Sequence, residues 1–462
     1  MFGLIVALLV VALCGYLIIK KYKAQAVLIC GGFIMMAVAI IFNFGPIVPA
    51  KASTGFAWFD LFKFVDDLAS HRTAELGLMI MVCAGFAKYM NKIGANKSLV
   101  NIAVKPLSYI QRPYWVLCGG FMIGQILHPF IPSASGFGLL LMVTVYPIYL
   151  SLGIPRTTAT AVIATNGCLD LGPASGNSIL AAKYAGITPV EYFINYQLPV
   201  AIAISLVMTI AHYFVQRYYD KKEEGGLAQG FVQQAVQMET AAVKQDDEPA
   251  PPPYYAILPA VPLILVLLFG YFKVGGIKMG INVALFIGIF AAMLIEYLRC
   301  MDLKKVLASI QHFFDGMGVQ FATVVTLIIA GETFAKGLQS LGAIDTMINA
   351  AESAGFGTNG MIFVMSAIIA FSALIMGSGN APFFAFSAFA PDVARKLGVE
   401  AVHILLPMQL TASVTRAISP IAAVVVAVSG VAGVSPFDVV KRTIVPLALG
   451  LVVIQIMTYL MF

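Results

Sequence analysis

The sequence predicts an all-α polytopic membrane protein made of two inverted repeats, each with five transmembrane helices and one re-entrant hairpin, and with a broken helix after each hairpin. Three observations support this fold class. Of the 462 residues, 60% are hydrophobic and 11% are charged, which is more apolar surface than a soluble protein of this size needs. Ten apolar stretches have the length of about 20 residues that crosses a bilayer. Short motifs from the first half of the chain also recur in the second half.

The apolar stretches divide into two sets of five. The sets are 2–19, 24–43, 74–90, 157–182 and 194–216, then 254–272, 279–297, 316–335, 401–429 and 443–461. Between the third and fourth members of each set lies a longer apolar region, 113–151 in one half and 357–394 in the other. Each region is too long for one crossing and carries small polar residues at its middle, so we expect a re-entrant hairpin in each.

Two other segments differ from the apolar spans in composition. Residues 217–253 are charged, rich in Gln and end in a run of prolines, which predicts a linker between a first repeat, 1–216, and a second, 254–462. Residues 52–72 mix aromatic and charged side chains at helical spacing, which predicts an amphipathic helix at the membrane surface. Within the repeats we expect scaffold helices at 1–90 and 254–335, hairpins at 113–151 and 357–394, and broken helices at 157–182 and 401–429.

The internal repeat is visible in matched motifs at an almost constant separation. "AGFAKYMNKIGA" (84–95) resembles "AGETFAKGLQSLGA" (330–343), and "AGITPVEY" (185–192) resembles "AGVSPFDV" (432–439). Including "LGI" with "LGV" and Pro199 with Pro446, the separations are 246, 247, 245 and 247 residues. The chain is therefore interpreted as an internal duplication, and an odd number of crossings in each half makes the second repeat inverted in the membrane.

The distribution of basic residues predicts the orientation. With the N-terminus outside, the cytoplasmic segments hold eighteen of the 28 Lys and Arg and the outside segments hold nine, while Arg416 lies within a span. This excess follows the positive-inside rule. We expect a multi-pass membrane protein with both termini outside and the linker in the cytoplasm. The net charge of +6 then reflects topology, and we expect no nucleic-acid partner.

Small polar residues interrupt both hairpins at corresponding places. At a separation of 245 residues, Ser378 in "GSGNAP" corresponds to Ser133 in "PSASGF". Each motif lies at the middle of its hairpin and is expected to form the tip. Non-helical backbone at membrane depth persists only where it is buried in protein or lines a watery cavity.

A second matched pair interrupts the fourth span of each half. "LDLGPASGN" (169–177) corresponds to "RAISPIAAV" (416–424), and Pro173 and Pro420 are 247 residues apart. Free N–H groups at half-helix N-termini attract carboxylates, while free carbonyls with Ser and Asn oxygens coordinate small cations. Two tips and two breaks therefore predict one central site for a small anion with a cation beside it.

These features resemble a known family. The two halves, the tips "SASG" and "GSGNAPF", and the stretch "TRAISPIAAVVVAVSGVAGVSPFDVVKR" are similar to the anaerobic four-carbon dicarboxylate carriers of the DcuC type, in the ion-transporter superfamily. The resemblance covers nearly the whole chain and is most specific in 376–446. It implies an elevator-type secondary transporter for succinate, fumarate or malate that works by exchange or by Na⁺ or H⁺ coupling. It also implies a homodimer formed through the scaffold helices.

The resemblance also implies where substrate and ions bind. In symporters of the superfamily, the hairpin tips and the adjacent breaks bind carboxylates and Na⁺. The corresponding residues here are Ser133, Ser135, Gly136, Gly172, Pro173, Ser378, Gly379, Asn380, Ser419 and Pro420. A Na⁺ ion is implied near Ser133, Gly172 and Asn380. Apart from such a coupling ion, we expect no cofactor.

Three isolated polar residues lie near these motifs. Arg416 is three residues before Ser419, and its planar guanidinium suits a carboxylate, although it could instead hold free carbonyls at the break. Asp170 could take up a coupling proton, bind Na⁺ or pair with Arg416. His128 could relay a proton or serve as an ordinary hydrogen-bonded histidine. All three are expected near the site.

The sequence weighs against an enzyme. It contains no HExxH motif, no Walker motif, and no nucleophile with a spaced base, and its six cysteines show no metal-ligand spacing. The alternatives that stay open are a cation/proton antiporter of the same superfamily and a carrier of another small organic anion. Because the broken segments offer hydroxyls, amides, helix N-termini and an Arg, we favour a dicarboxylate transporter in the lipid bilayer.

Overall fold

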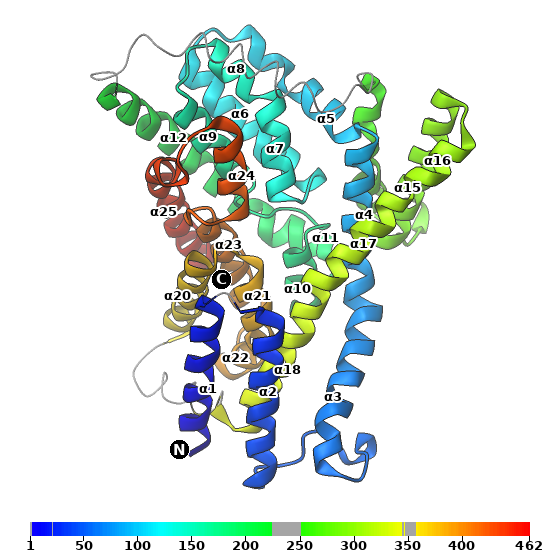
Figure 1. The fold of residues 1–462 in the computed structure, drawn as a ribbon, viewed down its shortest axis with the longest axis vertical. Coiled ribbons are helices and arrows are strands. Elements are labelled where there is room, and N and C mark those ends of the chain that lie inside the picture. Colours follow the sequence, from blue (N-terminus) through cyan, green and yellow to red (C-terminus); the bar gives the residue numbers. More distant parts are fainter. Residues whose placement is uncertain (1, 21, 224–250, 344–345, 347–356) are drawn as a thin grey trace.

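The structure, a computed structural model, describes residues 2–20, 22–223, 251–343, 346 and 357–462. These residues form helices and turns, with no β-strand among them. Eight helices of the described chain are long and apolar enough to cross a membrane: Ala24–Ile41, Ala57–Lys92, Pro189–Glu223, Pro253–Tyr271, Ile281–Cys300, Leu303–Ser340, Thr358–Met376 and Pro436–Met461. The described part of the chain is therefore all-helical and has the helices of a multi-pass membrane protein (Figure 1).

The helices follow one another along the chain in two halves. Those of the first half are α1 (Phe2–Ile19), α2 (Ala24–Ile41), α3 (Ala57–Arg72), α4 (Leu78–Lys92), α5 (Ala95–Val104), α6 (Pro113–Leu127), α7 (Ala134–Thr144), α8 (Tyr146–Ser151), α9 (Arg156–Thr165), α10 (Gly176–Ala185), α11 (Pro189–Glu191) and α12 (Leu198–Glu223). Those of the second half are α14 (Val261–Leu265), α15 (Ile281–Cys300), α16 (Leu303–Ser309), α17 (Gln311–Gln320), α18 (Thr326–Ser340), α20 (Thr358–Met376), α21 (Asn380–Phe386), α22 (Ala390–Leu397), α23 (Val402–Arg416), α24 (Ala423–Ala432) and α25 (Pro436–Met461).

Short helical segments of other types join or extend these helices. The π-helical segments are Thr73–Gly77 between α3 and α4, Tyr192–Gln197 between α11 and α12, Val266–Tyr271 after α14, and Phe321–Val325 between α17 and α18. The 3₁₀ segments are Ala50–Ala52, Lys105–Tyr109, His128–Phe130, Pro253–Ala260, Val274–Gly276 and Ser387–Phe389.

Two long helices cross in the middle of the fold. Residues 57–92 form one helix of 36 residues, and residues 303–340 form another of 38. They touch at their π-helical segments, where a Cβ on Gly77 would lie 3.1 Å from Val325 Cγ1. Farther along, α4 packs on α17, and a Cβ on Gly316 would lie 2.8 Å from the Cα of Gly85. Glycine at these positions permits the close crossing seen in Figure 1.

The amphipathic helix predicted at 52–72 does not lie apart as a surface helix. α3 begins at Ala57 and continues through Thr73–Gly77 into α4 as part of the same long helix. Its apolar face packs against α2 and α18. The prediction was wrong because an amphipathic pattern fits a helix packed on neighbouring helices as well as one lying on a membrane surface.

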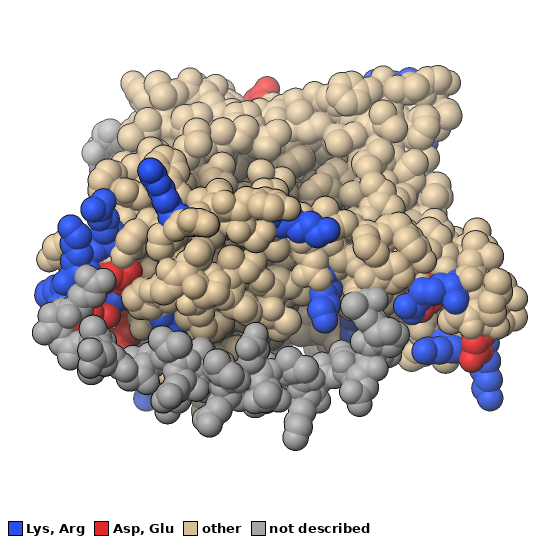
Figure 2. All heavy atoms as spheres, turned by 90° about the horizontal axis from the view of Figure 1, so that it is seen from above, with Lys and Arg blue, Asp and Glu red and all other residues tan. Residues whose placement is uncertain are grey.

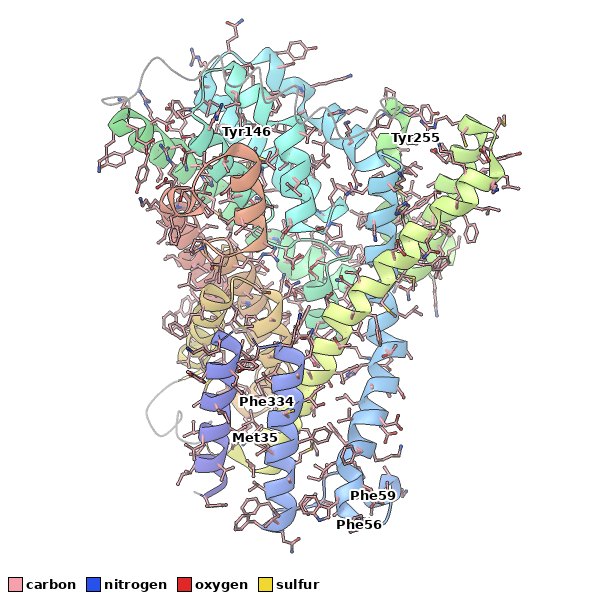
Figure 3. All side chains as sticks on the ribbon, viewed as in Figure 1. Met35, Phe56, Phe59, Tyr146, Tyr255 and Phe334 are labelled. Carbon is pink, nitrogen blue, oxygen red and sulfur yellow. The ribbon has the colours of Figure 1, made fainter. Side chains whose placement is uncertain are left out.

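Helix α2 lies against α18 over most of its length. A Cβ on Gly32 would lie 2.6 Å from the carbonyl oxygen of Thr333, and one on Gly337 would lie 2.9 Å from the carbonyl oxygen of Gly32. Figure 3 shows Met35 and Phe334 side by side at this contact. Because α1 packs on α2, these helices cover the outer side of the long helix 303–340.

Two of the predicted apolar spans are interrupted. The span at 157–182 consists of α9 and α10, with non-helical chain between Thr165 and Gly176. The span at 401–429 consists of α23 and α24, separated in the same way between Arg416 and Ala423. Since neither α9–α10 nor α23–α24 is one continuous helix, these segments place free backbone groups in the interior of the molecule.

The predicted linker at 217–253 begins later in the structure. α12 extends to Glu223, and its last turns are held by Arg442 of α25, which lies 2.7 Å from Asp220 and 2.6 Å from Glu223. Residues 224–250 lie outside the described residues. Where the chain resumes, Ser98 Oγ donates a hydrogen bond to the carbonyl oxygen of Pro252 at 3.2 Å.

Candidate functional site

The two breaks meet the start of α21 at one hydrogen-bonded cluster. Asn177, at the start of α10, donates to Asn380 Oδ1 at 3.1 Å, and Asn380 is the first residue of α21. Arg416, at the end of α23, reaches the same Asn380 Oδ1 at 3.4 Å and the carbonyl oxygen of Gly167 at 2.8 Å. Residues from both halves of the chain therefore form one polar site.

Asp170 joins this cluster from the first break. Its carboxylate accepts a hydrogen bond from Asn177 Nδ2 at 2.5 Å, and its other oxygen lies 4.0 Å from His128 Nε2. The Asp170 backbone is left-handed, with φ of 50°, a conformation that costs a non-glycine residue about 1–3 kcal/mol. The surrounding contacts must therefore hold this turn in place.

A pair of buried glutamines supplies those contacts. Gln197 and Gln409 both donate to the carbonyl oxygen of Asp170, at 3.3 and 3.2 Å. Gln197 also accepts from the backbone N–H of Gly172 at 3.0 Å and donates to Gln409 Oε1 at 3.1 Å, and Tyr192 donates to that same Oε1 at 3.0 Å. These side chains hold the break rigidly and so aim the Asp170 carboxylate at Asn177.

Close backbone contacts explain the glycines of the breaks and tips. Gly172 has φ of 105°, and a Cβ on it would lie 2.9 Å from Pro129 Cα in the 3₁₀ segment after α6. The second tip is equally close to α23, because a Cβ on Gly379 would lie 2.4 Å from the carbonyl oxygen of Ala412. Only glycine permits these approaches.

Replacing Gly379 with Ala should therefore displace the second tip. The added methyl overlaps the α23 backbone, which cannot move aside as a flexible side chain could. We expect substrate affinity about tenfold lower or worse, measured by binding to purified protein. Gly430→Ala is the matched control, since nothing lies within 4 Å of its Cβ position. Equal affinity in both variants would contradict the close packing of this tip.

The predicted first tip, residues 133–136, lies next to the same cluster, and its side chains make no hydrogen bond to it in the described chain. Ser133 caps α7 by accepting from the backbone N–H of Gly136 at 3.2 Å. The neighbouring Ala134 lies 3.0 Å from a Cβ built on Gly167, whose carbonyl oxygen binds Arg416. Ser133 is exposed, and Ser135 is half-buried beside it.

The other predicted residues lie at the breaks and the second tip. Pro173 and Pro420 lie in the non-helical segments after α9 and α23, and Ser378 is half-buried in the turn before α21. Ser419 is buried in the second break, and its hydroxyl has no hydrogen-bond partner among the described residues. Among the described residues, none of these side chains forms a hydrogen bond with Asn177, Asn380 or Arg416.

Buried polar atoms without a hydrogen-bond partner gather around the breaks. Within the described chain they include both ring nitrogens of His128, both amide atoms of Asn166, Asn177 Oδ1 and the hydroxyls of Ser175, Thr411, Thr415 and Ser419. A buried polar group without a partner costs about 1–3 kcal/mol, so such a concentration is typical of a ligand site. Both donors and acceptors are present, which suits a carboxylate and a small cation.

The sequence reasoning missed three residues of this arrangement. Asn177 is the last residue of the motif 169–177, and its place in that motif is the one feature of the sequence that could have indicated its role. Gln197 and Gln409 lie on helices outside the motifs, and nothing in their sequence surroundings marks them. In the part of the chain that the structure describes, no three His, Cys, Asp or Glu side chains form a group that could hold a metal.

Comparisons with known proteins agree with this architecture. Two solved transporter structures have similar folds. MtrF of Neisseria gonorrhoeae has a TM-score of 0.62 and 14% identity, and the match covers 94% of each chain. YdaH of Alcanivorax borkumensis has a TM-score of 0.61 and 13% identity, and the match covers 94% of this chain and 97% of YdaH. At these identities the likeness concerns the fold alone.

Similarity of sequence is more specific. The anaerobic C4-dicarboxylate transporter DcuC of Escherichia coli K12 is 36% identical over 458 residues, which is 99% of this chain and 96% of the relative. The family model described as "DcuC: C4-dicarboxylate anaerobic carrier" matches residues 2–462. This protein is therefore a member of the DcuC family of C4-dicarboxylate anaerobic carriers, a family of transporters and not of enzymes.

Proposed function

We propose that this protein is a secondary transporter that carries four-carbon dicarboxylates such as succinate, fumarate or malate across the bacterial inner membrane. The observation that carries the proposal is the position of Arg416. Its side chain lies between the two breaks, against Asn380 Oδ1 and a free carbonyl, and no ion pair of this guanidinium is found among the described residues. Arg416 is half-buried, and a cation at this depth without a matching anion is a suitable partner for a substrate carboxylate.

The neighbouring groups complete a carboxylate site. Asn380 Oδ1 already accepts from Asn177 and Arg416, which leaves its Nδ2 to donate to a substrate. α10 and α21 both begin at this point, so two helix N-termini add positive potential there. One carboxylate of the substrate would bind Arg416 and Asn380, and the other would lie toward the hydroxyls of Ser378 and Ser419.

The proposed architecture is a pair of inverted repeats that work as an elevator. The helices that follow the breaks, α10 and α24, begin 247 residues apart, and the π-helical segments Thr73–Gly77 and Phe321–Val325 are 248 residues apart, which supports a two-fold relation. We assign α6–α10 and α20–α24 to a moving transport unit. The first two helices of each half and the two long crossing helices form the scaffold, which is also the proposed surface of a homodimer.

The distribution of charge supports both termini being outside. In Figure 1 the helices α5, α6 and α8 lie at one end of the molecule, and Figure 2 views that end directly. Lys and Arg outnumber Asp and Glu on this face. By the positive-inside rule this end is cytoplasmic.

Asp170 is the proposed carrier of a coupling proton. Its carboxylate is bonded to Asn177 in the cluster that would bind substrate, so a proton held there would move together with the substrate. We expect Asp170→Asn to keep the left-handed turn and the contact with Asn177 while removing the charge. Exchange of substrate should continue, and the pH dependence of uptake should disappear. Unchanged pH dependence would instead assign Asp170 a structural role.

The test of the function is transport by purified protein in liposomes. Uptake of labelled succinate is measured against internal fumarate, with Na⁺ and pH gradients imposed separately. Uptake that requires internal dicarboxylate establishes exchange, and dependence on one gradient identifies the coupling ion. If folded protein transports no dicarboxylate under any condition, the proposal fails, and a cation/proton antiporter or a carrier of another organic anion takes its place.

A further inference from the structure

A cluster of charged side chains lies outside the substrate site, where α10 meets the two long helices. Arg72 Nε lies 2.7 Å from Glu332 Oε1, and Tyr184 donates a hydrogen bond to the same oxygen at 2.7 Å. Beside them, Lys183 Nζ lies 2.8 Å from Glu75 Oε2. These five residues, which we call the latch, connect α10 with the helix 57–92 and with α18.

The latch is balanced in charge and partly removed from solvent. It contains two cations and two carboxylates, and the side chains of Glu332 and Arg72 are 10% and 22% exposed. His71 also faces Glu75, at 3.2 Å. We call the Arg72–Glu332 pair the buried arm of the latch and the Lys183–Glu75 pair its exposed arm. Separating the buried arm leaves an uncompensated charge, so it resists opening far more than the exposed arm does.

The position of the latch relates it to the site. α10 begins next to Asn177, which binds Asp170 and Asn380, and ends with the latch residues Lys183 and Tyr184. On the other side of the latch, Arg72 immediately precedes the π-helical segment that contains Glu75. The latch therefore fixes one end of a helix that carries a site residue onto the helices of the proposed scaffold.

The positions related to the latch by the repeat carry residues that cannot form an equivalent cluster. At the separation of 248 residues between the π-helical segments, the positions matching Arg72, Glu75 and Glu332 are occupied by Gln320, Thr323 and Ala84. At the separation of 247 residues between the two breaks, the positions matching Lys183 and Tyr184 hold Gly430 and Val431. None of these five residues is charged, so a two-fold related arrangement could not form the same contacts.

We propose that the latch holds the transport unit on the scaffold in the arrangement described here and opens once in every transport cycle. The two end states of an elevator built from inverted repeats would be related by symmetry. Because the latch can form in only one of them, the state described here, it makes this state the resting one. The inference rests on the proposed elevator function, since it requires α10 to move against the long helices.

A reversible cross-link tests whether the latch opens. Glu75→Cys and Lys183→Cys are introduced together in a protein whose six native cysteines are replaced, and the pair is joined with a short cleavable bifunctional thiol reagent. We expect the cross-linked protein to bind fumarate with normal affinity but to lose at least about tenfold of its succinate uptake, which reducing agent restores. The matched control is Asp438→Cys with Lys441→Cys, an exposed pair within α25 whose cross-linking should leave uptake unchanged.

A charge substitution in the buried arm tests whether the latch sets the resting state. Glu332→Gln keeps the shape of the side chain but removes its charge, and we expect the Glu75–Lys183 cysteine pair to cross-link about threefold more slowly in this variant. Exchanging the charges with Arg72→Glu and Glu332→Arg should restore the faster rate. A merely structural role would lower the yield of folded protein without changing this rate.

The outcomes separate the two proposals. If the uncross-linked protein transports no dicarboxylate, the proposed function fails. If it transports dicarboxylate and the cross-linked protein does so at the same rate, α10 does not leave the long helices and the latch proposal is overturned. Unchanged cross-linking in Glu332→Gln would likewise show that the buried arm does not set the resting state.

Discussion

Arg416→Gln should reduce dicarboxylate uptake by about 100-fold or more while the protein still folds. Removing one partner of a buried, hydrogen-bonded charge pair costs about 2–5 kcal/mol of binding free energy, and Gln offers no charge to replace it. The variant should fold because, within the described residues, the guanidinium makes two hydrogen bonds, one to Asn380 Oδ1 and one to the carbonyl oxygen of Gly167. Binding of fumarate to purified protein, followed by liposome uptake, measures the effect.

Two further variants at arginine positions show whether the loss arises from carboxylate recognition. Arg416→Lys keeps the charge but not the planar fork, so affinity should fall by about tenfold, less than in the Gln variant. Arg395→Gln removes a cation that is 76% exposed on α22 and should change nothing. If Arg416→Gln binds fumarate normally, Arg416 only holds the free carbonyl of the break, and the carboxylate must bind elsewhere.

The sequence predicted the elements that depend on local chemistry. Apolar length predicted the helices, because a bilayer requires about 20 apolar residues for each crossing. Gly172, Pro173, Gly379 and Pro420 predicted where the chain leaves helical geometry, since these residues do not fit a helix interior. Arg416 and Asp170 were expected near the breaks because an ionisable residue in an apolar stretch is rare without a function, and both lie there in the structure.

What the sequence could not predict depends on the packing of distant segments. Gln197 and Gln409 hold the carbonyl oxygen of Asp170, but two glutamines 212 residues apart show no pattern that would connect them. The same holds for Asn177 and Asn380, whose contact needs both halves of the chain in place. Helix α3 was misread because its amphipathic pattern does not state whether a membrane surface or other helices cover its apolar face.

A buried ion pair joins α12 to α25. Arg442 and Asp220 lie 2.7 Å apart, with both side chains 1% exposed. Asp220 also accepts hydrogen bonds from Thr158 at 2.5 Å and from Tyr114 at 2.9 Å. The cluster thus ties α9, α6 and α25 to the last turns of α12 and satisfies every buried charge it contains.

Asp220→Ala should lower the free energy of unfolding by about 3–5 kcal/mol, because it leaves the Arg442 guanidinium buried with only the exposed Glu223 as a counter-charge. The double variant Asp220→Leu with Arg442→Met removes both charges and should be markedly more stable than the single variant, since no uncompensated ion remains. Thermal unfolding in detergent measures both variants. The control is Asp438→Ala, which breaks an exposed ion pair on α25 and should shift the free energy of unfolding by less than about 1 kcal/mol. A double variant as unstable as the single one would mean that packing, and not charge, holds α12 to α25.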